Sequence, residues 1–180
     1  MDKEFAKLAK WACIADAILC IPYFILVIIA AASKGHFSFH LGLMFVTVGY
    51  SGLSIVITIA LMSLLEKVMN TKKYNPILWF IVISSVFPIG YEIIKLVGAL
   101  SHVLNIFFIA VSIICQIAFT VFSFSARNLQ SYLSKQWKRL CTINVVIGIC
   151  CVLLITFPIG IILNVISSIW CAQIFSRASQ

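Results

Sequence analysis

Four long stretches of the chain carry almost no charge, and they limit its fold more than any other feature. The first runs from Trp11 to Ser33 and is broken only by Asp16, and the second runs from His40 to Leu65. Each is long enough for one transmembrane helix, which needs about 20 mostly apolar residues to cross the hydrocarbon core of a bilayer. We therefore predict an all-α fold, a polytopic transmembrane helix bundle.

The composition excludes a water-soluble domain. Of the 180 residues, 63% are hydrophobic and 10% are charged, whereas soluble domains have roughly 45–50% apolar and about 25% charged residues. A chain of this length has too little interior to hide so many apolar side chains, so the surplus must face lipid. We expect residues 1–180 to form a single membrane-embedded domain, without a separate soluble domain.

The third stretch, which contains only Glu92 and Lys95 as charged residues, is long enough for two crossings. From Asn75 to Ser125 there are about fifty mostly apolar residues, which is roughly 75 Å of helix, and the hydrocarbon core is about 30 Å thick. The polar residues Ser101 and His102 lie near its middle. We predict the break between two helices there.

The fourth stretch also exceeds one crossing. No charged residue lies between Arg139 and Arg177, a distance of roughly 55 Å of helix. Pro158 and Gly160 predict a turn within it, because proline removes a helix donor and glycine tolerates unusual backbone angles. This turn gives six helices in all. A five-helix form, with the carboxyl end on the opposite side of the membrane, stays open.

The distribution of basic residues predicts the orientation. Lysine and arginine total 13 against 5 acidic residues, and the six-helix topology places eleven of them on one side and two, Lys34 and Lys95, on the other. Basic residues in short loops stay in the cytoplasm, so we expect a cytoplasmic amino terminus and a multi-pass protein of the cell membrane. The same spacing argues against nucleic-acid binding. The eleven are Lys3, Lys7, Lys10, Lys67, Lys72, Lys73, Arg127, Lys135, Lys138, Arg139 and Arg177.

The amino-terminal segment resembles a cleavable signal peptide, with basic residues followed by an apolar run and small residues. The apolar run from Trp11 to Ala32 is longer than the roughly 7–15 residues typical of such peptides. We therefore expect it to remain as the first transmembrane helix.

Three prolines occur in similar apolar surroundings and are candidates for helix breaks, together with Gly160. They are Pro22, Pro88 and Pro158, separated by 66 and 70 residues. One interpretation is a repeat of three helix hairpins, over residues 11–68, 75–126 and 140–176, as in transporters that bind substrate at broken helices. The other is ordinary tolerance of proline in transmembrane helices. Both stay open.

Ionisable residues inside the bilayer are candidates for function because they are costly unless paired or hydrated. Three qualify: Asp16, Glu92 and Lys95. Glu92 and Lys95 lie three apart on one helix face and are predicted to neutralise each other, beside Tyr91.

Helical depth, counted at 1.5 Å per residue, predicts two polar layers. The inner layer holds Asp16, Gln116 and Asn144, and the outer layer holds Glu92, Lys95, Asn105 and Asn164.

The sequence gives little support for a catalytic site or a metal site. The seven cysteines include no Cys-x-x-Cys pair and are interpreted as small buried hydrophobes. His36 and His40 are four apart but fall in a predicted loop.

The segment from Gly49 to Gly52 matches the Gly-x-Ser-Gly pattern of rhomboid intramembrane proteases. However, no histidine follows His102, so Ser51 lacks a base at its depth. We expect no enzyme activity, no metal and no cofactor.

Two functions remain. The first is a non-enzymatic multi-span protein that acts by binding another membrane protein, as an accessory subunit, an immunity protein or a regulator does. The second is a small permease, a substrate-binding membrane subunit or a channel for a small solute or ion. Both place the protein in the lipid bilayer, and both leave its oligomeric state open.

Overall fold

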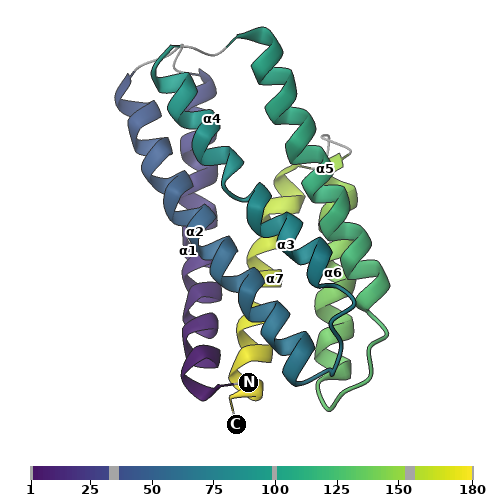
Figure 1. The fold of residues 1–180 in the computed structure, drawn as a ribbon. Coiled ribbons are helices and arrows are strands. Elements are labelled where there is room, and N and C mark those ends of the chain that lie inside the picture. The colour runs from purple at the N-terminus through teal and green to yellow at the C-terminus, as the bar shows by residue number, and fades with distance from the viewer. Residues whose placement is uncertain (1, 33–36, 99–100, 153–156, 180) are drawn as a thin grey trace.

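The computed structural model describes residues 2–32, 37–98, 101–152 and 157–179, with the side chains of 30–32, 37–40, 151–152 and 157–158 left outside the description. This described part is helical and contains no strand (Figure 1). Its helices are α1 (Lys3–Ala32), α2 (Phe37–Lys67), α3 (Asn75–Ser84), α4 (Phe87–Leu96), α5 (His102–Ala126), α6 (Ser134–Val152) and α7 (Phe157–Ala178).

Helices α3 and α4 follow one another end to end and make one crossing, interrupted at Ser85 and Val86. Pro88 is the second residue of α4, where its missing N–H costs nothing. Over the described ranges the chain therefore forms six rods, α1, α2, α3–α4, α5, α6 and α7, which run alternately up and down. Both chain ends lie at the same end of the bundle (Figure 1). We call this the terminal end and the other the distal end.

The described helices confirm an all-α polytopic transmembrane bundle. Five of them, with α3 and α4 counted together, are long and apolar enough to cross a membrane. The described part of α6 falls short because Lys135, Lys138 and Arg139 occupy its first turns. The break predicted at Ser101 and His102 is confirmed: α5 begins at His102, and the Ser101 hydroxyl accepts a hydrogen bond from the Leu104 N–H at 3.2 Å.

Two of the expected helix breaks are wrong. Pro22 lies inside α1, which continues through it to Ala32, as transmembrane helices allow. Pro158 and Gly160 do not form a turn, because both belong to the first turn of α7. The described part of α6 ends at Val152 and that of α7 begins at Phe157, and residues 153–156 lie outside the described residues. Whether the three hairpins are true repeats stays a prediction.

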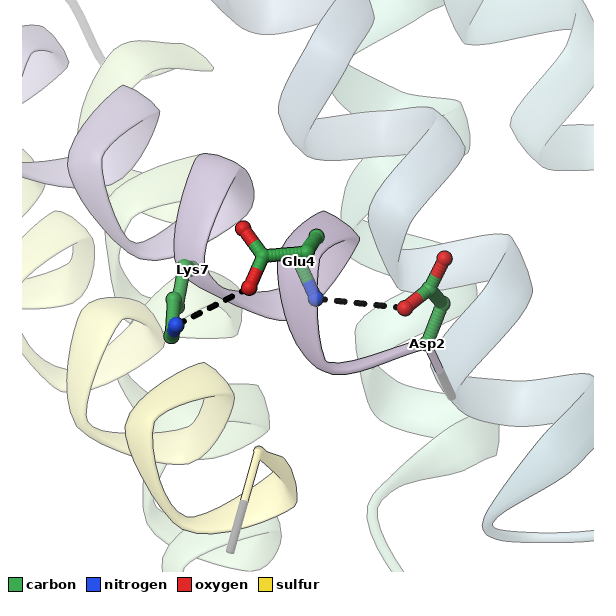
Figure 2. A network of polar contacts seen from close by, with 3 residues as sticks. All are labelled: Asp2, Glu4 and Lys7. Atoms are coloured by element: carbon green, nitrogen blue, oxygen red, sulfur yellow. Dashed lines mark hydrogen bonds and ion pairs between the residues drawn. The ribbon is translucent and has the colours of Figure 1, made fainter.

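The amino terminus of α1 is held by a small polar network on the surface of the bundle (Figure 2). The Asp2 carboxylate accepts a hydrogen bond from the Glu4 N–H at 3.2 Å, and Lys7 Nζ lies 2.9 Å from Glu4 Oε1. An aspartate ahead of a helix satisfies a free N–H in its first turn. The Lys7–Glu4 ion pair is largely exposed, so it contributes little to stability.

The best-packed part of the bundle is its terminal end. Helix α1 packs against α2 and α7, and α6 packs against α5 and α7. Two side chains from neighbouring rods bond to carbonyls in the last turn of α5: Trp137 Nε1 donates to Ala126 O at 2.7 Å, and the Tyr74 hydroxyl donates to Ser125 O at 3.0 Å. The largest fully buried side chains are Trp137, Phe175, Leu64, Leu65, Leu78, Leu133 and Ile174.

The distal half of the bundle is packed more loosely. In α5, whose residues are all described, the buried ones are Phe122, Ser123 and Ala126, all near its terminal end. In α4, which is also fully described, the buried residue is Glu92. The bundle is therefore closed at the terminal end and less filled towards the distal end.

Candidate functional site

A cavity of about 260 Å³ lies inside the bundle and is lined by residues from all six rods. A second cavity of about 230 Å³ adjoins it, because the two share Tyr50, Gln116, Phe119, Asn144 and Asn164. Together they reach the size of small-ligand pockets. We call them the polar cavity after their polar lining side chains, which are Asp16, Tyr23, Tyr50, Ser54, Thr58, Ser85, Gln116, Asn144, Asn164, Ser167 and Ser168.

Asp16 supplies the carboxylate of the polar cavity. Its side chain comes from α1 and is 6% exposed, and its Oδ2 accepts a hydrogen bond of 2.6 Å from the Ser168 hydroxyl of α7. The ion pairs of the described residues are Lys7–Glu4 and Lys72–Glu66, so neither includes Asp16. The carboxylate thus lies among hydroxyl and amide groups without a lysine or arginine partner in the described chain.

Two asparagines link α7 to other rods across the cavity. Asn164 donates from Nδ2 to the Tyr50 hydroxyl of α2 at 2.8 Å, and Asn144 of α6 accepts from the Ser167 hydroxyl at 2.5 Å. Hydrogen bonds between helices inside a bilayer contribute about 0.6–2 kcal/mol each. The polar groups therefore hold the rods in register as well as lining the space between them.

Two tyrosines form the wall of the cavity between α1 and α2. The rings of Tyr23 and Tyr50 are stacked, with centroids 5.2 Å apart and planes 3° from parallel. Because Tyr50 also accepts from Asn164, its ring is fixed both by stacking and by a hydrogen bond. A rigid aromatic wall of this kind presents a π face and a hydroxyl to the cavity.

The interruption between α3 and α4 borders the cavity. Ser85, at the break, donates from Oγ to Ile81 O at 2.8 Å and lies 3.3 Å from the Ser54 Oγ of α2. Broken transmembrane helices place polar backbone and hydroxyl groups at membrane depth, where such groups bind solutes in transporters. This break therefore places the Ser85 hydroxyl at the wall of the cavity.

The cavity ends at the packed core on one side and continues on the other. Its floor is made of core residues at the terminal end: Cys13, Leu61, Leu140 and Cys171. From Asp16, the lining continues along α1 to Tyr23, seven residues or about 10 Å nearer the distal end. On α7 it reaches Gly160, eight residues before Ser168. The space thus opens from the closed end of the bundle towards its looser half.

The structure brings together most of the polar residues singled out from the sequence. Asp16, Gln116 and Asn144 line the same cavity, as expected of the inner layer. The placement of Asn164 in the outer layer is wrong, because it bonds to Tyr50 in this cavity. The error came from assuming that all helices begin at one level. Asn164 is about 10 Å from the start of α7 and Tyr50 about 20 Å from the start of α2, so α7 begins nearer the middle of the bundle.

Glu92 and Lys95 are not within ion-pair distance of each other, although the positive charge of Lys95 acts on the Glu92 carboxylate. Glu92 is 8% exposed, and its Oε2 has no hydrogen-bond partner among the described residues. Lys95 Nζ instead lies 5.8 Å from the ring centre of Tyr91. The Tyr91 hydroxyl donates to Asn105 Oδ1 at 3.0 Å, which links α4 to α5. Within the described chain, the ion pairs lie at the terminal end.

Sequence reasoning missed the serines and tyrosines of the cavity. A usable signal lay in α7, where Asn164, Ser167, Ser168 and Cys171 follow the spacing of one helix face. A similar face in α2 carries Tyr50, Ser54, Thr58 and Leu61. Polar residues repeated along one face of an apolar helix indicate a polar interior, although they do not identify the facing rods.

The described residues contain no group of three or more His, Cys, Asp or Glu side chains that could hold a metal ion. The structure shows free cysteines at Cys13, Cys20, Cys115, Cys141 and Cys171. Ser51, in the rhomboid-like segment, is buried in α2, while His102 is at the start of α5. His36 and the side chain of His40 lie outside the described residues.

Comparisons with known proteins add no relative. No protein-family model, no curated protein and no solved structure matches the chain. The function must therefore be argued from the cavity itself.

Proposed function

We propose that this protein binds a small cationic solute in the polar cavity and passes it across the membrane, as a small permease or substrate-binding membrane subunit does. The observation that carries the proposal is the buried Asp16 carboxylate, which faces a cavity lined from all six rods and has no basic partner among the described residues.

The chemistry of the lining favours a cation. A charged carboxylate at membrane depth is costly, and an ammonium group or metal cation beside it offsets that cost. The surrounding hydroxyl and amide oxygens of Ser54, Asn144 and Ser168 can accept hydrogen bonds from a protonated amine or coordinate a small ion. The stacked tyrosines add an aromatic face that attracts cations.

The packing suggests a direction of access. The terminal end carries eleven of the basic residues, so by the positive-inside rule we expect it to face the cytoplasm. The core closes the cavity on this side, and the lining continues towards the distal half. In this proposal the solute enters from the outer side, and the α3–α4 break lets its two halves move separately.

Binding to the purified protein tests the proposal. The probes are radiolabelled methylamine, choline, a short diamine and the alkali cations, measured by equilibrium binding in detergent at neutral pH. We expect one or more to bind, and Asp16→Asn to weaken that binding about tenfold or more, as loss of a charged hydrogen-bonding partner does. Asp2→Asn is the matched control, because it removes the same charge from the exposed end of α1 and should leave binding unchanged.

Two outcomes would overturn the proposal. One is that no probe binds to a preparation whose helical circular dichroism and thermal unfolding are those of a folded bundle. The other is that Asp16→Asn, shown to be folded by the same measurements, binds as tightly as Asp2→Asn. Vesicles containing the protein then distinguish a permease, which gives flux of the bound cation, from a subunit that only binds it.

A second candidate function is binding of a membrane partner, and the exposure of α5 favours it. Many of the apolar side chains of α5 are large and exposed. Its buried residues, all of which are described, lie near its terminal end. A photo-crosslinking residue at Ile113 of α5, compared with one at Ile18 of α1, tests it in native membranes. Both side chains are exposed. A discrete adduct from Ile113 alone supports a partner on α5, and lipid adducts alone from both positions argue against one.

A further inference from the structure

A groove of about 530 Å³ lies on the outer surface of the bundle between α6 and α7. It is separate from the polar cavity, since the two share no lining residue among those described. Its residues are Lys135, Lys138, Arg139, Thr142, Ile143, Val146, Leu163 and Trp170. We call it the α6–α7 groove.

One end of the α6–α7 groove is strongly basic. Lys135, Lys138 and Arg139 are three and four residues apart in the first turns of α6, so their side chains lie on one helix face. All three are exposed, and the ion pairs of the described chain use Lys7 and Lys72 instead. Three positive charges therefore lie together, and none of them forms an ion pair within the described chain.

The acidic residues of the chain are too few to neutralise this cluster. The sequence contains five. Glu4 and Glu66 are bonded to other lysines, and Asp16 and Glu92 are buried within the bundle. Asp2 caps the start of α1. A ligand for the cluster must therefore bring its own negative charge.

The rest of the α6–α7 groove is apolar and leads away from the charges into the membrane. Ile143 and Val146 lie four and seven residues after Arg139 on α6, and Leu163 lies seven residues, or about 10 Å, further from the terminal end than Trp170 on α7. Tryptophan is typical of the level where headgroups meet acyl chains. The groove thus changes from basic to apolar along the membrane normal.

We propose that the α6–α7 groove binds an anionic phospholipid of the leaflet that faces the terminal end. Its phosphate lies against the three cations, where the Arg139 guanidinium can form paired hydrogen bonds with it, and one acyl chain lies over Ile143, Val146 and Leu163. A soluble phosphate compound satisfies the cations but leaves the apolar part of the groove uncovered. Basic pockets between transmembrane helices bind anionic lipid headgroups in this way.

Quenching of Trp170 fluorescence by brominated lipids tests the site. The protein carries Trp11→Phe and Trp79→Phe, which leaves Trp170 in the groove and Trp137, which is 1% exposed. It is reconstituted in phosphatidylcholine with increasing amounts of brominated phosphatidylglycerol or brominated phosphatidylcholine. We expect brominated phosphatidylglycerol to quench at a mole fraction at least about five times lower than brominated phosphatidylcholine does. About fivefold is the factor that one basic residue near an anionic surface supplies. Trp170→Phe gives the baseline.

Charge variants separate a site from general attraction to an anionic surface. Lys135→Gln, Lys138→Gln and Arg139→Gln together should remove the preference for phosphatidylglycerol. Lys3→Gln, Lys67→Gln and Lys73→Gln together remove the same charge from the same end of the bundle and should keep it. Circular dichroism and thermal unfolding establish that both triple variants are folded.

Three results would overturn the proposal. They are equal quenching by the two lipids, equal loss of the preference in both triple variants, and relief of quenching by millimolar glycerol phosphate. The last would identify a soluble phosphate site instead of a lipid site.

Discussion

The Ser168 hydroxyl donates a hydrogen bond of 2.6 Å to Asp16 Oδ2, across 152 positions of sequence. The two residues belong to α7 and α1, the last and first helices, which pack directly against each other. The polar cavity is therefore complete only when the whole chain has been inserted and its ends have met. Until then the Asp16 carboxylate lacks the partner that it has in the folded bundle.

Ser168→Ala should lower the free energy of unfolding by about 1 kcal/mol, within the range of about 0.6–2 kcal/mol for hydrogen bonds between transmembrane helices. Equilibrium unfolding in mixed detergents measures this change. Ser112→Ala is the control, because the Ser112 hydroxyl is exposed and bonds only within α5, to Phe108 O at 2.9 Å. A loss as large in Ser112→Ala would show that the effect does not come from the contact between α1 and α7.

Gly148→Ala should destabilise the bundle by about 1–3 kcal/mol, the usual cost of overfilling a packed site. A Cβ at Gly148 of α6 would overlap Thr120 Oγ1 of α5 and lie 2.9 Å from Thr120 Cβ. Thermal unfolding measures the loss. Gly52→Ala should be neutral or stabilising, because a Cβ there meets nothing within 4 Å and alanine favours helix. Equal effects of the two substitutions would contradict a close contact between α5 and α6.

Tyr74→Phe should cost about 0.5–1.5 kcal/mol, because it removes the hydrogen bond to Ser125 O and leaves that carbonyl in the last turn of α5 without this partner. Tyr74 is 8% exposed, so water replaces the bond poorly. Tyr132→Phe changes the same atom on a side chain that is 71% exposed and should have no measurable effect. Chemical denaturation of both variants checks the difference.

The Lys72–Glu66 ion pair predicts a small pH dependence at the surface. Lys72 Nζ lies 2.6 Å from Glu66 Oε1, and this hydrogen bond, together with the charge of Glu66, raises the pKa of Lys72 above its ordinary value. The pair therefore favours folding below the unfolded pKa of lysine, and its contribution is lost as pH rises through the folded pKa. NMR titration of ¹³C-methylated lysines should show the pKa of Lys72 falling in Glu66→Gln. No change would contradict the pair.

Apolar length and charge predicted the six rods of the described chain and the common end of the bundle at which the chain ends lie. They succeed because lipid requires each crossing to satisfy its own backbone hydrogen bonds, so span length can be read from a single segment. The break at Ser101 and His102 was visible for the same reason. The turn expected at Pro158 and Gly160 was wrong because proline was taken to end a helix, whereas Pro158 lies where α7 begins.

The polar cavity was harder to predict, because it depends on which rods are neighbours. Depth along a helix placed Asp16, Gln116 and Asn144 together, but the contact of Asn164 with Tyr50 depends on how far α7 is displaced along the membrane normal. No local pattern encodes that displacement. The partners of the α7 serines can be identified only once α1 is known to face them, because the same residues could equally have faced another helix.

The shared position of the two chain ends has a consequence for how the protein can be extended. Because the described chain forms an even number of rods, Lys3 and Ala178 belong to helices that begin and end at one end of the bundle. Soluble domains attached to either of them would reach the same compartment. Two copies joined in tandem would insert in the same orientation, and so would form a parallel pair instead of the inverted pair that duplication gives when the number of crossings is odd.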